Sequence, residues 1–169
     1  MEFTRVLAVY PFVRRFGFVV LEEPSQLIDW GVRAISRDKN KRCVLLVNGL
    51  IDHYKPDVLI LEDWKAKGFR RSRRIQGLIA GLIAFAKSKN IKAQTIPREL
   101  VIKAFSSFDA VTKYQIALLI ASRFPELALQ MPPIRKPWMG KDYRMGIFDS
   151  MALALTFFCL ENQQQLAAD

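Results

Sequence analysis

The chain has 169 residues, of which 51% are hydrophobic and 25% charged, and its formal net charge is +10. This composition excludes a disordered tail, and the length suits one globular domain. Its longest apolar stretch, residues 75–86, falls short of the about 20 residues that a membrane span needs. We therefore expect no membrane partner. Two cysteines cannot form a disulfide framework, so we expect a cytoplasmic protein. The excess of Lys and Arg favours a polyanionic partner, most often nucleic acid.

The first third of the chain is expected to form strands. Residues 6–10 are a continuous apolar run typical of a strand buried on both faces, and residues 17–21 and 27–35 follow as further strands. Helical spacing of apolar residues predicts a helix over 39–54, and the run 58–61 predicts a strand parallel to the first. The second half predicts a strand over 93–96 and helices over 75–89, 99–105, 112–124 and 146–160.

This order of elements predicts an α/β protein with a mixed sheet covered by helices. We expect one domain over residues 1–162. The polar residues 163–169 are expected to form a frayed C-terminal tail.

Several segments resemble the RuvC branch of the RNase H-like nucleases, the resolvases of four-way DNA (Holliday) junctions. The opening VLAVYPFVRRFGFVV is similar to that family's first hairpin, and YKPDVLILE to its strand that ends in a catalytic Glu. Three helices of the family resemble the segments RRIQGLIAG, TKYQIALLI and FDSMALALTF. The segments follow the family's order over nearly the whole chain. The resemblance implies an RNase H-like fold with a mixed five-stranded sheet flanked by helices.

The resemblance also implies where a metal site would lie. Such nucleases hold two divalent metals about 3.5–4 Å apart, and magnesium requires oxygen ligands. Glu62 and Asp149 match two of the family's carboxylates, so they are the expected catalytic and metal-binding residues. Tyr10 and Gly146 stand where two further acids are expected, and a neutral tyrosine is a poor magnesium ligand. The ligand count therefore argues against Mg²⁺ or Mn²⁺ without excluding either, and aspartates at both positions should rebuild the site.

Two other acids are candidates for the missing ligand. If Tyr10 pairs with Gly17 across the first hairpin, Glu22 lies roughly 17 Å farther along the strand. Asp142 precedes Asp149 by two helical turns, about 10 Å if the helix extends that far. We expect neither acid to complete the site.

Basic residues crowd the segment that follows Glu62. Beside a cleft they would contact the phosphate backbone, although a charge run is also typical of a solvated face. This segment, residues 64–74, is called the basic loop, and its cations are Lys65, Lys67, Arg70, Arg71, Arg73 and Arg74.

Other residues extend this predicted interface. The resemblance implies that Phe69 stacks on bases at the junction centre, while packing against the protein is the alternative. Lys103 and Lys113 match family lysines that contact DNA, and the alternative is that both are ordinary surface lysines. A second basic segment precedes Asp149 and is expected to form the other wall of the cleft. It contains Arg135, Lys136, Lys141 and Arg144.

The helix expected over residues 75–89 carries small residues on one face. Gly77 and Gly81 would allow a close approach, either by a second copy of the chain in a homodimer, as the resemblance implies, or by the chain's own sheet.

Three functions remain in view. The first is RuvC-like binding of branched or structured nucleic acid, of the Holliday-junction type, with a catalytically impaired metal site. The second is an active divalent-metal-dependent endonuclease or junction resolvase that uses Glu62, Asp149 and an unrecognised third ligand. The third is a basic protein-interaction or assembly scaffold without nuclease activity.

Overall fold

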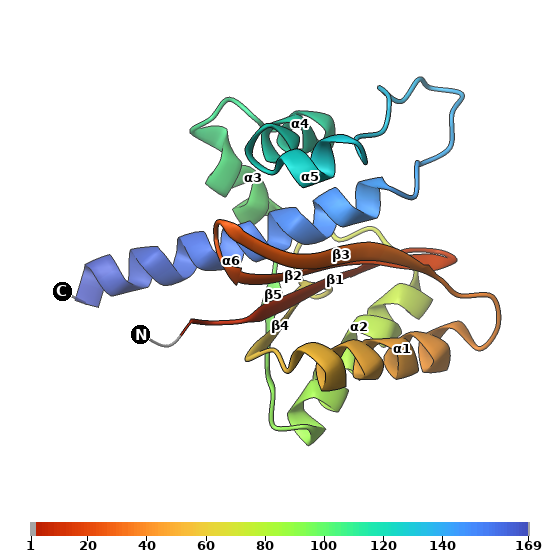
Figure 1. The fold of residues 1–169 in the computed structure, drawn as a ribbon. Helices are drawn as coiled ribbons and strands as arrows, with labels where there is room; N and C mark the ends of the chain where they lie inside the picture. Colours follow the sequence, from red (N-terminus) through yellow and green to blue (C-terminus); the bar gives the residue numbers. More distant parts are fainter. Residues whose placement is uncertain (1–2, 169) are drawn as a thin grey trace.

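The computed structural model describes residues 3–168 and has helices on both faces of a five-stranded sheet (Figure 1). The strand order is β3-β2-β1-β4-β5. β2 runs antiparallel to both β1 and β3, whereas β4 runs parallel to both β1 and β5. This arrangement confirms the mixed sheet expected from the sequence. The strands are β1 (Val6–Pro11), β2 (Arg15–Glu23), β3 (Gln26–Ala34), β4 (Val58–Glu62) and β5 (Lys92–Ile96).

The helices form two layers, one on each face of the sheet (Figure 1). One layer packs the helix pair α1 (Lys39–Tyr54) and α2 (Arg73–Ser88) against the sheet. The other layer places α6 directly on the sheet, with α3 to α5 outside it. Its helices are α3 (Arg98–Ser106), α4 (Lys113–Arg123), α5 (Pro125–Ala128) and α6 (Met145–Ala168).

Alternation along β1 decides which side chains face which layer, because successive residues of a strand point to opposite faces. Leu7 and Val9 pack with α1 and α2, whereas Ala8 and Tyr10 pack with α6. Tyr10 therefore faces the helix that carries Asp149.

The register of the first hairpin agrees with the sequence expectation. Tyr10 pairs with Gly17. Glu22 lies toward the other end of β2, where its carboxylate is 2.9 Å from the guanidinium of Arg5. Glu22 is thus held away from the end of β1, as the strand geometry predicted.

The last helix is longer than expected. We predicted that it would end near residue 160 and that the following tail would be frayed, but α6 continues through Ala168. Residues 161–168 contain mostly Glu, Gln, Leu and Ala, which are good helix formers, and this explains why the helix continues although its end is exposed. Residue 169 lies outside the described residues.

α6 is also long and apolar enough to cross a membrane, judged by length and composition alone. However, 56% of the 18-residue apolar stretch that meets this criterion is buried inside the protein. Such burial is typical of the core helix of a globular protein.

Two glycines allow α6 to lie directly on β2. A Cβ atom added to Gly17 would collide with the backbone carbonyl of Gly146. A Cβ atom added to Gly146 would lie 2.5 Å from Cε1 of the Phe12 ring. The start of α6 is therefore seated against a glycine on one side and an aromatic ring on the other.

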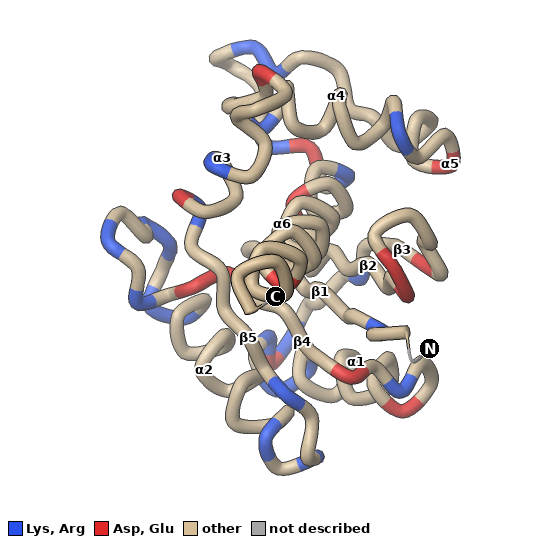
Figure 2. Tube along the Cα trace, turned by 90° about the vertical axis from the view of Figure 1, so that its left-hand side faces the viewer, with Lys and Arg blue, Asp and Glu red and all other residues tan. Residues whose placement is uncertain are grey.

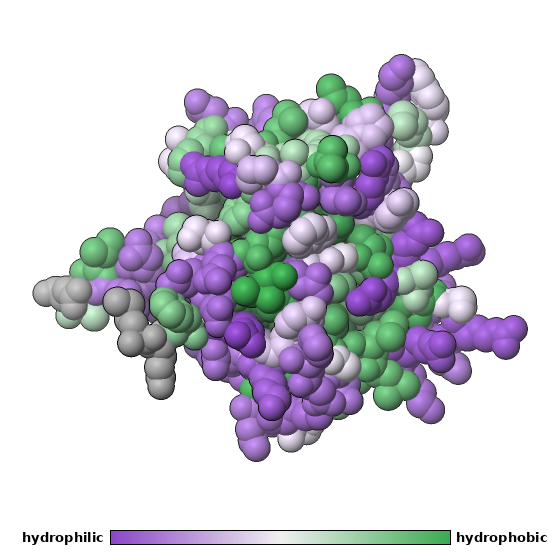
Figure 3. All heavy atoms as spheres, viewed as in Figure 1, coloured by the Kyte–Doolittle hydropathy of each residue, from purple (hydrophilic) through white to green (hydrophobic). Residues whose placement is uncertain are grey.

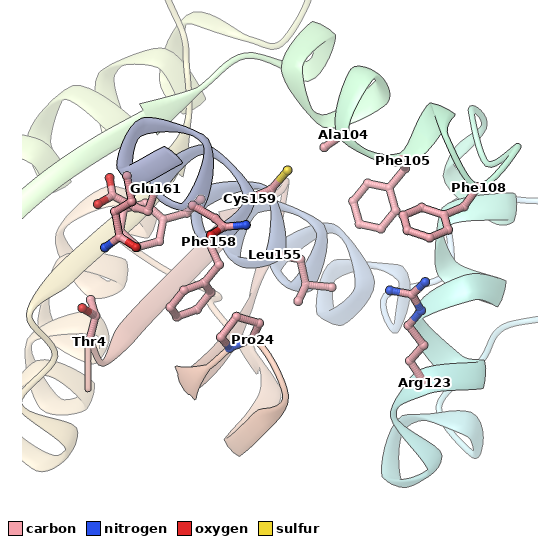
Figure 4. A pocket seen from close by; sticks show the side chains of 13 residues that line it. Thr4, Pro24, Ala104, Phe105, Phe108, Arg123, Leu155, Phe158, Cys159 and Glu161 are labelled. Carbon is pink, nitrogen blue, oxygen red and sulfur yellow. The ribbon is translucent and has the colours of Figure 1, made fainter. Parts of the chain in front are cut away.

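A hollow of about 460 Å³ lies along the C-terminal half of α6 (Figure 4). Its walls include the rings of Phe105, Phe108 and Phe158 and the guanidinium of Arg123, which lies 4.3 Å from the centre of the Phe108 ring. Leu155 is the first α6 residue along this wall, about 9 Å along the helix axis from Asp149. The hollow is thus separate from Glu62 and Asp149, neither of which lines it.

Candidate nucleic-acid interface

Tyr10, Glu62 and Asp149 line one small hollow. β1 and β4 are neighbouring parallel strands, so Tyr10 and Glu62 emerge at the same edge of the sheet. Asp149 lies one turn inside α6 and faces them. All three are buried, with 7%, 9% and 8% of their surface exposed. Two carboxylates at this depth require nearby cations, because an unpaired buried charge is strongly destabilising.

Three cations from different segments meet the two carboxylates. Arg71 of the basic loop lies 3.4 Å from Glu62 Oε2. The ammonium of Lys113, at the start of α4, lies 3.5 Å from Asp149 Oδ1, and that of Lys141 lies 3.4 Å from Asp149 Oδ2. Each carboxylate that could hold a metal is therefore paired with a basic side chain of the chain itself.

The ring of Tyr10 lies at the centre of this cluster. Its centroid is 4.6 Å from the Arg71 guanidinium and 5.0 Å from each of the Lys113 and Lys141 ammonium groups, so cations face the ring from several segments. The Lys113 ammonium also donates a hydrogen bond of 3.1 Å to the phenolic oxygen. Burial, and next the charge of Asp149, raise the pKa of the Tyr10 phenol, so the group is neutral at pH 7.

The two lysines respond differently to this environment. Burial lowers the pKa of Lys141, and the Asp149 carboxylate only partly offsets this effect. Burial acts in the same direction on Lys113, but Asp149 and Tyr10 outweigh it and its pKa is raised. Both ammonium groups lie within 3.5 Å of an Asp149 oxygen, and this carboxylate favours their charged forms.

These residues do not fit a divalent metal pair. Within residues 3–168, no group of three or more His, Cys, Asp or Glu side chains is arranged to hold a metal ion. Tyr10 is neutral, and both carboxylates already face cations. Asp142, the alternative ligand, is engaged by Arg144, whose Nε and Nη2 lie 3.0 and 2.8 Å from its two oxygens. The guanidinium, against the opposing effect of burial, lowers the pKa of the Asp142 carboxyl.

The cations lie along a groove made of three adjoining hollows. Lys113 lines a hollow of about 310 Å³ beside the basic loop and another of about 370 Å³ beside residues 132–145. Lys141 lines the second hollow and a third of about 270 Å³ at the β1–β2 turn. This surface, called the cationic groove, thus runs from the basic loop to the β1–β2 turn. Of the second basic segment, Arg135 and Lys141 line this groove, whereas Lys136 and Arg144 do not.

The basic loop is an arch of Lys and Arg between β4 and α2 (Figure 2). Figure 3 shows hydrophilic side chains projecting at the edge of the molecule where β1 turns into β2 and α1 begins. Of the predicted loop residues, Lys67, Phe69, Arg70 and Arg71 line the cationic groove. Phe69 also packs against the apolar layer under α2, so its ring is half-buried. Whether it stacks on bases stays a prediction.

Other predicted contacts lie outside this lining. Arg74 is turned inward, where it donates hydrogen bonds to Asn40 and to the carbonyl of Val13. It fixes the start of α2, a structural role that the sequence did not reveal. Lys65, Arg73 and Lys103 are exposed, and their contact with nucleic acid stays a prediction.

Arg98 is a further cation of the site that the sequence patterns did not indicate. It is the first residue of α3 and lines both hollows that Glu62 lines. A signal was present, because Arg98 lies two residues after the end of β5, which pairs with β4 through Ile96 and Glu62. A residue after that strand end must lie near Glu62.

The small residues of α2 face outward. A Cβ atom added to Gly81 would meet no atom within 4 Å, and one at Gly77 would meet only the Asn40 side chain, at 4.0 Å. Close packing against the chain's own sheet is therefore not what these glycines serve.

Comparison with known proteins gives a result for the structure and none for the sequence. No protein-family model matches the sequence, and no curated protein does either. Thermus thermophilus RuvC is similar in structure, with a TM-score of 0.66 and 14% identity over 94% of this chain and 97% of that one. The same protein in complex with a Holliday junction substrate gives 0.63 and 15%, over 94% and 95%.

The yeast mitochondrial Holliday junction resolvase Ydc2 is similar to the same degree. Its TM-score is 0.67 at 15% identity, with 97% of this chain and 81% of that chain covered. These likenesses extend over nearly the whole chain. The chain therefore has the RuvC-like, RNase H-like fold of the Holliday junction resolvases.

Proposed function

We propose that this protein binds branched nucleic acid of the four-way junction type in its cationic groove. We also propose that the protein does not catalyse metal-dependent cleavage of the bound nucleic acid. The observation that carries the proposal is the pairing of each buried carboxylate with cations of the chain. Arg71, Lys113 and Lys141 contribute three positive charges against two negative ones, so this cluster has a net charge of +1. Such a site attracts phosphate and repels metal ions.

The overall charge and the fold support the same proposal. The net charge of +10 favours a polyanionic partner, and a Holliday junction is the substrate in one of the similar solved structures. The cationic groove adds a local surface where such a partner would bind.

Removing two exposed cations of the basic loop should reduce the salt dependence of junction binding. Each phosphate contact contributes about 0.9 to the slope of log affinity against log salt concentration, so Lys67→Ala with Arg70→Ala should lower the slope by about 2. Fluorescence anisotropy with a labelled four-way junction over a salt series measures this slope.

A matched pair of exposed lysines serves as the control. Lys87 and Lys92 lie at the last turn of α2 and the start of β5, at the other end of these elements. Lys87→Ala with Lys92→Ala removes the same charge and should leave the slope unchanged. Equal slopes for both double variants would remove the basic loop from the binding surface.

The wild-type protein should not nick a labelled junction in the presence of either Mg²⁺ or Mn²⁺. Two carboxylates that already face cations offer too few free oxygen ligands for a metal pair. Gel analysis of labelled strands measures cleavage. Metal-dependent cleavage that Glu62→Gln abolishes would contradict the proposal and establish the active nuclease instead.

We also propose a homodimer through the outward face of α2. The open space over Gly81 supports a close approach by a second copy, and two-fold pairs are the most common oligomers. Sedimentation that shows single chains at every concentration, with and without junction, would contradict this dimer.

A further inference from the structure

One oxygen of Asp149 is buried without a hydrogen bond, and the residue as a whole is 8% exposed. Oδ2 is buried and no donor satisfies it with hydrogen-bond geometry, while the Lys141 ammonium lies 3.4 Å away. A carboxylate oxygen buried in this way needs a charge at close range. Lys141 supplies that charge from the segment before α6, and not from the helix itself.

Two aromatic rings hold the same ammonium group. Lys141 Nζ lies 5.0 Å from the centre of the Tyr10 ring and 5.3 Å from that of Phe12, and rings at this range attract a cation. Tyr10 stands where the resemblance expects a metal-binding acid, and Phe12 directly follows the end of β1. These two residues therefore build a cation site that suits a tethered ammonium better than a free ion.

Glu62 has an equivalent partner. The Arg71 guanidinium lies 3.4 Å from Glu62 Oε2 and 4.6 Å from the Tyr10 ring centre, so the second retained carboxylate also faces a cation backed by Tyr10. The Lys141 side chain is 34% exposed and that of Arg71 is 19% exposed. Both lie on the lining of the cationic groove, where donors not used by the carboxylates can reach an anion.

We infer that Lys141 and Arg71 are tethered cations that take the place of divalent metals and bind a backbone phosphate of the nucleic acid directly. This inference rests on the proposed function. It adds that the binding of the phosphate nearest Glu62 and Asp149 needs no metal ion.

The test compares junction affinity in a chelator and in Mg²⁺, at matched ionic strength, for the wild type, Lys141→Ala and Lys141→Arg. The wild type should bind equally well in both conditions. Lys141→Ala should bind about eightfold more weakly in chelator at about 0.1 M salt, because one counterion-releasing contact is lost. Magnesium should restore that loss, because it can then bridge Asp149 and the phosphate.

The controls separate this role from a structural one. Lys141→Arg keeps the charge and should bind in chelator like the wild type, and Lys87→Ala should lose no affinity in either condition. Circular dichroism melts verify that each variant is folded. A magnesium effect limited to Lys141→Ala is a readout that a merely structural lysine would not produce.

The failing outcomes are distinct. A wild type that binds junctions more tightly in Mg²⁺ than in chelator would overturn the inference. So would an affinity of Lys141→Ala equal to the wild type, or a loss that magnesium does not restore. In these cases junction binding itself stands. If the wild type binds no junction in either condition, the proposed function fails instead.

Discussion

Gly17→Ala should lower the free energy of unfolding by about 3 kcal/mol, because the new methyl group would collide with backbone and not with a movable side chain. The obstructing atom is the carbonyl oxygen of Gly146, which is fixed in the first turn of α6 and accepts a hydrogen bond from Ser150. Relief requires α6 to shift on the sheet. Urea denaturation followed by circular dichroism measures the change.

Gly49→Ala is the matched control for this substitution. Gly49 lies inside α1, and a Cβ atom there would meet nothing within 4 Å. Alanine should stabilise the protein by roughly 0.5–1 kcal/mol at this position, since it is the better helix former. If both variants shifted the midpoint of urea denaturation equally, the close contact between α6 and β2 at Gly17 would be contradicted.

Phe12 and Gly146 should be energetically coupled. Gly146→Ala places a methyl group 2.5 Å from Cε1 of the Phe12 ring and is expected to cost about 1–3 kcal/mol. In a Phe12→Ala background the ring is gone, so the same substitution should cost much less. The interaction energy of the double-mutant cycle should be about 1–2 kcal/mol, measured by urea denaturation of the four proteins. Additive effects would show that the two residues do not share this space.

This coupling revises what the sequence led us to expect of a rebuilt metal site. Aspartates at positions 10 and 146 appeared sufficient when only ligands were counted. In the structure, Phe12 occupies the space of a side chain at position 146, and Lys113 and Lys141 lie where they would neutralise an aspartate at position 10. A rebuilt site therefore requires the ring and at least one lysine to be removed as well.

Local patterns in the sequence predicted most of the fold. Apolar runs identified β1 and β4, and helical spacing predicted the limits of α1. The Tyr10–Gly17 register followed from the hairpin. These features depend on neighbouring residues, so a single sequence contains enough information.

The candidate site was only partly predictable because its contacts join distant segments. The positions of Tyr10, Glu62 and Asp149 followed from the resemblance, but the contacts of Asp149 with Lys113 and Lys141 did not. A basic segment gives no indication of which member turns inward. Arg74 illustrates the same limit, because its hydrogen bond to the Val13 carbonyl spans 61 positions of the chain.

The first residue of α4 links the folding of that helix to Asp149. Lys113 follows the Thr112 cap, at the end of the helix where the backbone dipole is positive. A cation there destabilises the helix by typically about 0.3–1 kcal/mol, because it opposes the dipole. A nearby anion interacts favourably with the dipole and with the cation. Asp149, 3.5 Å from the ammonium, is such an anion. The Asp149 carboxylate thus also offsets an unfavourable helix start, so it stabilises the fold whatever its other role.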